Sequence, residues 1–276
     1  MMKLQKNMNK IIVFTFSVLL LLLYVFPFFI VLINSFKGRL EIIKNPLSFP
    51  ENLTFENFIS AYETMNFGKV FLNSLIVTVL SVTIIIFFSS MLAYYLVRWK
   101  SKFNNSVFMS LVISMIIPFQ CLMIPFVTIY GKMNLLNNKY MLVFFYLGFG
   151  VSLATFLFHG FIKAIPFELE EAAIIDGASQ YQTFFKIIFP MLKPTITTVA
   201  ILDVLWVWND FLLPSLVLVD ENARTIPLST FYFFGKYTAE YNTAMAALIL
   251  SLIPVIVFYL VMQKQIIKGI TDGAIK

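Results

Sequence analysis

Six long apolar stretches constrain what this chain can fold into. They cover residues of about 11–33, 70–97, 107–130, 141–162, 195–219 and 243–262. Each is close to the roughly 20 residues that an α-helix needs to cross a bilayer. Only 12% of the residues are charged, about half the share of roughly 25% that soluble domains carry. The sequence therefore predicts an all-α membrane protein, in which residues 1–276 form one transmembrane domain of six helices.

The first stretch follows three lysines, as the apolar core of a secretory signal would. Its apolar run is longer than the roughly 7–15 residues of such a core, and no A-x-A cleavage site follows it. We therefore expect a retained helix. Prolines interrupt the third and sixth stretches, at Pro118, Pro125 and Pro254. Breaks of this kind are tolerated where neighbouring helices or water satisfy the freed carbonyl groups.

The basic residues predict the orientation of the helices. Six spans place both termini on the same side of the membrane. If that side is the cytoplasm, the inner segments hold twelve of the twenty Lys and Arg residues and the outer segments hold eight. Cytoplasmic segments of membrane proteins carry such an excess. We therefore expect a multi-pass protein of a bacterial cell membrane with both termini in the cytoplasm, where residues 163–194 also lie.

Motifs for catalysis or metal binding are absent from the sequence. Three Gly-Lys pairs occur, but none has the surrounding residues of a phosphate-binding loop. Cys121 is the only cysteine and His159 the only histidine, and His159 has no Cys or acid cluster near it. We expect no enzyme activity, metal or cofactor in this chain. The net charge of +6 does not indicate nucleic-acid binding, because lysines and arginines in a membrane protein are sorted by leaflet.

Two acidic residues lie inside the fifth stretch, at Asp203 and Asp210. Ionisable groups within a membrane usually face the interior of a helix bundle or a water-filled cavity. Trp206, Asn209 and Asp210 are candidates for lining a sugar pathway, since indoles and carboxylates are common sugar-contacting groups. A polar contact that holds helices together is the other interpretation. The sequence leaves both open.

The segment EAAIIDGASQYQTFFKIIFP, residues 171–190, is unlike its apolar surroundings. Acids after Pro166 suit the first turn of a helix. Ala172 and Ala173 would leave a smooth face, and Gly177 would end that helix in a left-handed conformation. Ser179 and Gln182 have the spacing of a capping box, which starts a second helix. We expect that helix to run over residues 180–189, before Pro190.

The second helix would place aromatic and aliphatic side chains on one side, namely Tyr181, Phe184, Phe185 and Ile188. A helix that only rests on lipid headgroups would favour basic residues on its exposed face. The acids, the alanine pair and the glycine turn instead favour a docking element for a cytoplasmic partner.

This segment resembles the EAA loop of permease subunits of binding-protein-dependent ABC importers. The family pattern is E-A-A, three residues, G, nine residues, then I-x-L-P, and Phe189 is the one departure from it. The matching residues are Glu171, Ala172, Ala173, Gly177, Ile187 and Pro190. WNDFLLP at 208–214, RTIPLSTF at 224–231 and the C-terminal GITDGAIK resemble the maltose-type carbohydrate branch.

The resemblance implies a type I importer permease fold and a sugar substrate. It implies a second permease subunit, two cytoplasmic ATPase subunits that bind ATP and Mg, and an extracytoplasmic solute-binding protein as partners. Residues 163–194 would couple the ATPases to the helices, with Glu171 and Asp176 contacting basic residues there. A stand-alone secondary transporter or channel is the alternative, although such proteins usually show paired halves with broken helices. The particular sugar stays open.

Overall fold

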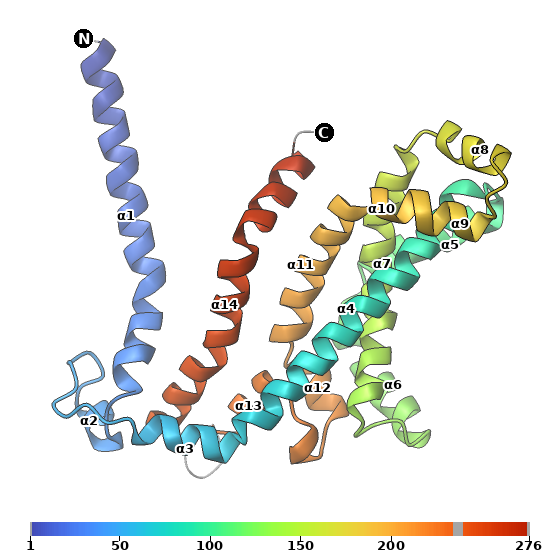
Figure 1. The fold of residues 1–276 in the computed structure, drawn as a ribbon. Coiled ribbons are helices and arrows are strands. Elements are labelled where there is room, and N and C mark those ends of the chain that lie inside the picture. Colours follow the sequence, from blue (N-terminus) through green and yellow to red (C-terminus); the bar gives the residue numbers. More distant parts are fainter. Residues whose placement is uncertain (1, 234–239, 275–276) are drawn as a thin grey trace. The chain divides into compact units, whose positions relative to one another are not determined.

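The computed structural model describes residues 2–233 and 240–274, with side chains over 10–233 and 240–265. The described residues form helices and contain no strand (Figure 1). Lys236 and Lys276, which enter the count of basic residues, lie outside the described residues, as does the end of the C-terminal tail at 275–276. The longer helices are α1 Met2–Asn34, α3 Glu56–Met65, α4 Phe67–Arg98, α5 Lys102–Ser114, α6 Phe119–Lys132, α7 Lys139–Lys163, α11 Lys193–Asn209 and α14 Tyr241–Ala274.

Four helical stretches are long and apolar enough to cross a membrane without interruption, namely Lys10–Asn34, Phe67–Arg98, Lys139–Lys163 and Tyr241–Gln265. They correspond to the first, second, fourth and sixth apolar stretches of the sequence. Two bent helix pairs raise the number to as many as six, by length and composition. The all-helical architecture is the predicted one.

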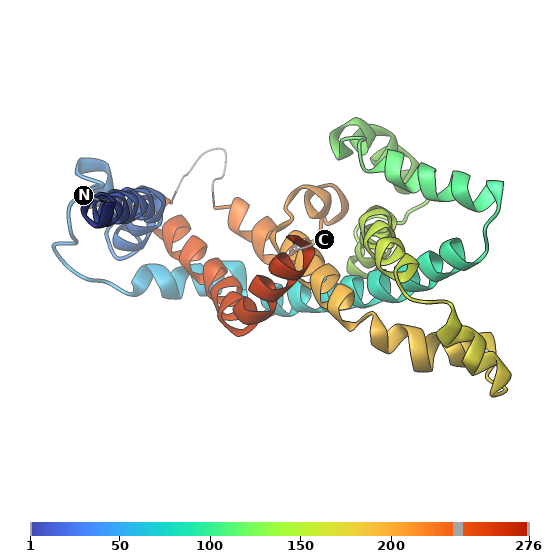
Figure 2. The ribbon, with the colours of Figure 1, turned by 90° about the horizontal axis from the view of Figure 1, so that it is seen from above.

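The third span, expected over 107–130 with breaks at Pro118 and Pro125, is interrupted at Pro118, whereas Pro125 lies within α6. It consists of α5 and α6, which meet at an angle of 104° (Figure 2). Pro118 begins α6 with an extended backbone. A residue before a proline is disfavoured in the α region, because its N–H and Cβ clash with the proline ring. This steric conflict ends α5 before Pro118 and lets the chain turn.

The fifth span also differs, since the helix expected over 195–219 ends at Asn209. Asp210 has an extended backbone, and its carboxylate accepts a hydrogen bond from the Leu212 amide at 2.9 Å. The side chain thereby accepts from the first amide of the short helix α12, Leu212–Val217, whose N-cap residue is Phe211. An Asp side chain often bonds the backbone amide two residues on in this way, and the bond satisfies an amide that the new helix leaves free. At its other end α11 is bent by 72° from residues Gln180–Met191.

The chain divides into two compact units, Met1–Gly68 with Ser229–Val257, and Lys69–Leu228 with Phe258–Lys276. In the first unit, the amide of Asn57 donates to the carbonyls of Ser35 and Lys37, and Asn242 donates to Asn57 at 2.7 Å. These bonds fasten the segment after α1 to the start of α14.

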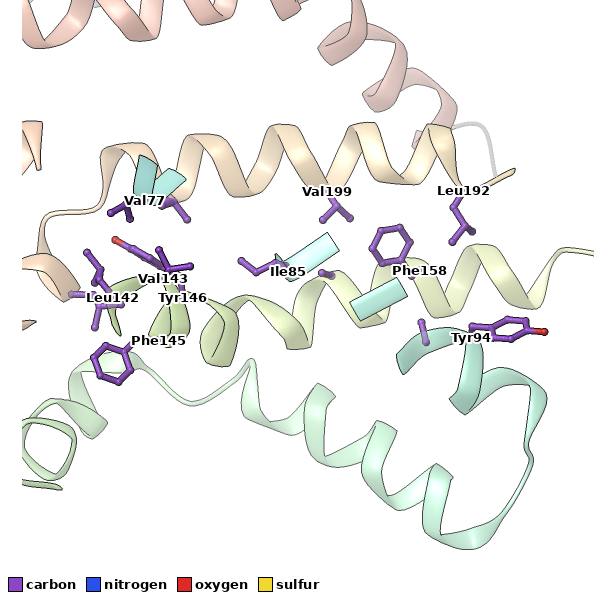
Figure 3. Close-up of a cluster of buried hydrophobic side chains, with 14 of the residues drawn as sticks. Val77, Ile85, Tyr94, Leu142, Val143, Phe145, Tyr146, Phe158, Leu192 and Val199 are labelled. Atoms are coloured by element: carbon purple, nitrogen blue, oxygen red, sulfur yellow. The ribbon is translucent and has the colours of Figure 1, made fainter. Parts of the chain in front are cut away.

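The second unit is built around α4, α7 and α11, whose buried side chains meet in Figure 3. Ile85 of α4, Phe158 of α7 and Leu192 before α11 are fully buried. Lipid tails are as apolar as leucine, so packing between helices rather than exclusion from water selects this arrangement. The stability of this core therefore depends on how closely the side chains of the three helices fit together.

Gly150 illustrates this dependence. A Cβ added there would lie 2.6 Å from Cδ1 of Ile85 and 3.4 Å from Cζ3 of Trp206. We expect Gly150→Ala to lower the free energy of unfolding by about 1–3 kcal/mol, as overpacking does. Gly148→Ala is the matched control on the same helix, because nothing lies within 4 Å of its added Cβ. Thermal unfolding in detergent checks the pair, and equal midpoints for both variants would contradict the expectation.

Candidate functional site

The segment 163–194 leaves the membrane helix α7 and folds as two short helices joined by a turn (Figure 1). The first, α8, spans Glu168–Ile175 and carries Glu168, Glu170 and Glu171 in its first turn. Acids there interact favourably with the positive end of the helix dipole. The first half of the expected helix pair is thus present, and it begins two residues after Pro166.

Gly177 makes the turn that ends α8. Its φ of +84° is in the left-handed region, which glycine adopts without the steric penalty of a Cβ. The Ala178 amide donates to the Ala173 carbonyl at 2.9 Å, and the Gly177 amide donates to the Ile174 carbonyl at 3.0 Å. This pair of hydrogen bonds is the Schellman motif, which satisfies carbonyls that the helix end would leave free.

A capping box starts the second helix, α9 Gln180–Thr183. The Ser179 amide donates to Oε1 of Gln182 at 2.8 Å, and the Gln182 amide donates to Oγ of Ser179 at 3.3 Å. The two residues therefore satisfy each other's amides, as their spacing predicts.

The second helix continues past Pro190, unlike the expected end at residue 189. Residues Phe184–Ile188 form a π-helical turn, in which the Phe189 amide donates to the Phe184 carbonyl, and α10 Phe189–Met191 follows. A proline clashes with the carbonyl four residues earlier in a regular α-helix, and the wider turn lies where that clash would occur. Such single π-turns are frequent at functional sites.

The exposed surface of this segment differs in part from the expected one. Ala172 is exposed but Ala173 is buried, so the two alanines do not form one smooth face. Phe184 and Ile188 are buried, whereas Tyr181 is largely exposed and does not share their side. Glu171, Asp176, Gly177 and Pro190 are exposed, and Ile187 is half-buried.

Three apolar side chains stand out on this exposed surface, namely Ile174, Ile175 and Tyr181. Ile175 is 84% exposed, at the last position of α8. We call these three residues, together with the exposed acids Glu168, Glu171 and Asp176, the α8 docking surface. Exposed apolar side chains that share a short segment with charged ones are typical of a surface that binds another protein.

Glu170 was not singled out from the sequence, yet it is the buried acid of the loop. It is 2% exposed and pairs with Arg98 at 2.6 Å. The sequence shows only three acids within four residues. No local signal distinguishes Glu170 from the other two acids, because its partners Tyr94 and Arg98 lie far away in the sequence.

The structure brings two of the three candidate pathway residues together through Tyr146 of α7. The Tyr146 hydroxyl donates to Oδ2 of Asp210 at 2.9 Å, and its ring packs edge-on against Trp206 with centroids 5.4 Å apart. Asn209 does not join them, because its amide donates to the Leu205 carbonyl of its own helix. Asp203 is buried elsewhere on α11.

Asp210 thus serves two partners, and replacing it tests both contacts. Asp210→Ala leaves both the Leu212 amide and the buried Tyr146 hydroxyl without their acceptor, so we expect a loss of about 1–3 kcal/mol in unfolding free energy. Asp210→Asn keeps one acceptor oxygen and should lose less. Thermal unfolding of the two variants checks this order, and an unchanged midpoint for Asp210→Ala would contradict it.

No group of three or more His, Cys, Asp or Glu side chains that could hold a metal ion occurs within the described part of the chain.

Residues 85–272 match the family described as "Binding-protein-dependent transport system inner membrane component". The chain belongs to this family. The matched region contains the segment 163–194, the Tyr146–Asp210 contact, most of the second half of α4 and the whole of α7 and α11. The family is one of inner-membrane transport components and not of enzymes, which agrees with the multi-pass helical architecture.

Several relatives of this permease family align along almost the whole chain. The chain is 45% identical, over 98% of both sequences, to the probable starch degradation products transport system permease protein AmyC of Thermoanaerobacterium thermosulfurigenes. It is 36% identical over the full length of both sequences to the multiple sugar-binding transport system permease protein MsmG of Streptococcus mutans. It is 35% identical, over 91% of both, to the melibiose/raffinose/stachyose import permease protein MelC of Bacillus subtilis.

A chain of a solved ABC transporter shares the fold. A chain of a bacterial ABC transporter that imports the acidic polysaccharide alginate superposes with a TM-score of 0.77 over 94% of this chain and 97% of that chain, at 20% identity. The type I importer permease fold expected from the sequence is therefore the observed one.

Proposed function

We propose that this chain is the permease subunit of an ATP-driven importer of oligosaccharides, and that it forms half of the translocation pathway. The family match over residues 85–272 carries the proposal. The relatives support a sugar as substrate, since their names include starch degradation products and the melibiose, raffinose and stachyose group. Oligosaccharides of two to four units are the substrate class we infer.

The α8 docking surface is the element that we assign to ATPase binding. Ile174, Ile175 and Tyr181 offer apolar contact area, and the surrounding acids offer charge-assisted hydrogen bonds to basic residues of a partner. Gly177 fixes the angle between α8 and α9. Ala172 lets a partner approach closely, Ile187 and Pro190 shape the return of the chain to the membrane, and Glu171 and Asp176 supply the charges.

The remaining parts of the importer follow from this assignment. A second, related permease subunit would complete the pathway, and two cytoplasmic ATPase subunits would bind ATP and Mg. A solute-binding protein would deliver the sugar from outside, and lipid would surround the apolar helices. The excess of basic residues on one side supports an orientation with both termini and the docking surface in the cytoplasm. Trp206 and Asp210, joined through Tyr146, are the side chains that we place beside the sugar; Asn209 is exposed on the same turn.

Affinity purification tests the proposal. The tagged chain is extracted from native membranes in mild detergent, its partners are identified, and uptake of maltotriose, melibiose and raffinose is measured in vesicles with and without internal ATP. We expect an ATPase and a second permease to co-purify and uptake to require ATP. A chain that purifies without an ATPase and imports a sugar along an ion gradient would instead be a secondary transporter.

A further inference from the structure

Glu170 is an inward-facing acid on a helix whose other acids face outward. It is 2% exposed, whereas Glu168 and Glu171 on either side are exposed. A carboxylate is rarely buried unless it is paired and hydrogen-bonded, because its desolvation is costly. The contacts of Glu170 therefore indicate what this side of α8 does.

Both carboxylate oxygens of Glu170 are engaged by residues near the end of α4. Nε of Arg98 donates to Oε1 at 2.6 Å, and Nη2 of Arg98 lies 2.6 Å from the same oxygen. The Tyr94 hydroxyl donates to Oε2 at 2.8 Å. Charged hydrogen bonds of this length are among the strong ones in proteins.

Arg98 holds the chain leading into α8 at two further points. Its Nη2 donates to the Ile165 carbonyl at 3.2 Å, and its guanidinium lies 5.6 Å from the centroid of the Phe167 ring. One side chain at the last position of α4 thus contacts three places along residues 165–170. The contacts join segments that are more than sixty residues apart in sequence.

We propose that the buried Glu170–Arg98–Tyr94 cluster is the positioning element that makes α8 and α4 move as one body. α4 is a helix of 32 residues that packs in the core, so a displacement of α8 held at Arg98 reaches the middle of the membrane. The two chain connections of α8 are a proline-containing segment and the Gly177 turn, and neither is helical. The cluster supplies a direct side-chain link between the two helices.

The role in ATP coupling rests on the proposed function, but the attachment of α8 to α4 does not. Spin labels at Glu168→Cys on α8 and Phe88→Cys on α4, in a Cys121→Ser background, measure the attachment in the full chain reconstituted in nanodiscs. We expect one narrow distance distribution. Removing one partner of a buried pair leaves the other charge uncompensated, so Glu170→Gln should raise the ratio of detached to docked α8 about tenfold or more.

Matched variants separate the cluster from general damage. Tyr94→Phe removes one hydroxyl and should broaden the distribution, whereas Tyr95→Phe on the neighbouring, half-exposed ring should not. Glu171→Gln is the same substitution at the neighbouring, exposed glutamate, and it should also leave the distance distribution narrow. The exchange Glu170→Arg with Arg98→Glu should restore part of the narrow population. Distributions as narrow as that of the parent protein in both Glu170→Gln and Tyr94→Phe would overturn the attachment.

Sugar imported per ATP hydrolysed then distinguishes coupling from folding. In the purified complex, maltotriose or raffinose is the transported probe, whichever the unmodified complex imports. We expect Tyr94→Phe and Glu170→Gln to lower this ratio while ATP hydrolysis continues. An unchanged ratio with a smaller yield of complex would overturn the coupling role and leave only a folding contact. Failure of the unmodified chain to bind any ATPase would refute the proposed function, while the distance measurement would still decide the attachment.

Discussion

Replacing Gly177 with valine is expected to reduce ATP-driven sugar uptake about 10- to 100-fold while leaving the protein in the membrane. The φ of +84° at this position is strained for any residue with a Cβ, by roughly 1–3 kcal/mol. The strain is greatest for a β-branched side chain. The turn would open, the two hydrogen bonds that end α8 would be lost, and the docking surface would change direction. Uptake of maltotriose or raffinose and the amount of membrane protein are measured in cells that lack the chromosomal copy.

Gly177→Asn is the matched control for this prediction. Asparagine enters the left-handed region more readily than other residues with side chains, and no heavy atom lies within 4 Å of the Cβ position. Uptake by the asparagine variant should therefore stay within about threefold of the unmodified protein, since the residual strain is small. Normal uptake by the valine variant would show that the turn geometry is not needed.

The second large effect is expected at the tip of α8. Ile175→Asp places a charge where we infer an apolar contact, and a charge left unpaired in an interface costs several kcal/mol. Co-purification of the ATPase should then fall about 100-fold, as a loss of roughly 3 kcal/mol implies. The side chain is 84% exposed in the isolated chain, so the fold itself should not suffer.

Val219→Asp provides the control for the Ile175 variant. Val219 is also largely exposed, but it follows α12, away from the α8 docking surface. ATPase recovery should be unchanged in this variant. Equal recovery of the ATPase with both variants would remove Ile175 from the docking surface.

Local sequence signals predicted local structure well in this chain. The Gly177 turn and the Ser179–Gln182 capping box depend only on residues within one or two helical turns. The apolar stretches of α1, α4, α7 and α14 predicted helices because length and composition decide such spans. Each of these features could be read from one short window of sequence.

Features that depend on distant segments could not be read in this way. Glu170 and Glu171 are neighbours with the same side chain, and only the position of Tyr94 and Arg98 decides which of them is buried. Ala172 is exposed and Ala173 is buried for the same reason. The sequence marked the break at Pro118, but it did not predict that α11 ends at Asn209, because apolar composition continues across Asp210.

The π-helical turn at Phe184–Ile188 has a consequence for how the docking surface is aimed. Each residue of an α-helix turns the chain by about 100°. One residue more or fewer between α9 and α11 would therefore rotate α8 about the helix axis by roughly that angle. The wider turn contains one more residue than an α-helical turn. The direction in which the α8 docking surface faces therefore depends on the number of residues in this turn. Deleting a single residue from the turn would change that direction even if every residue of the docking surface were kept.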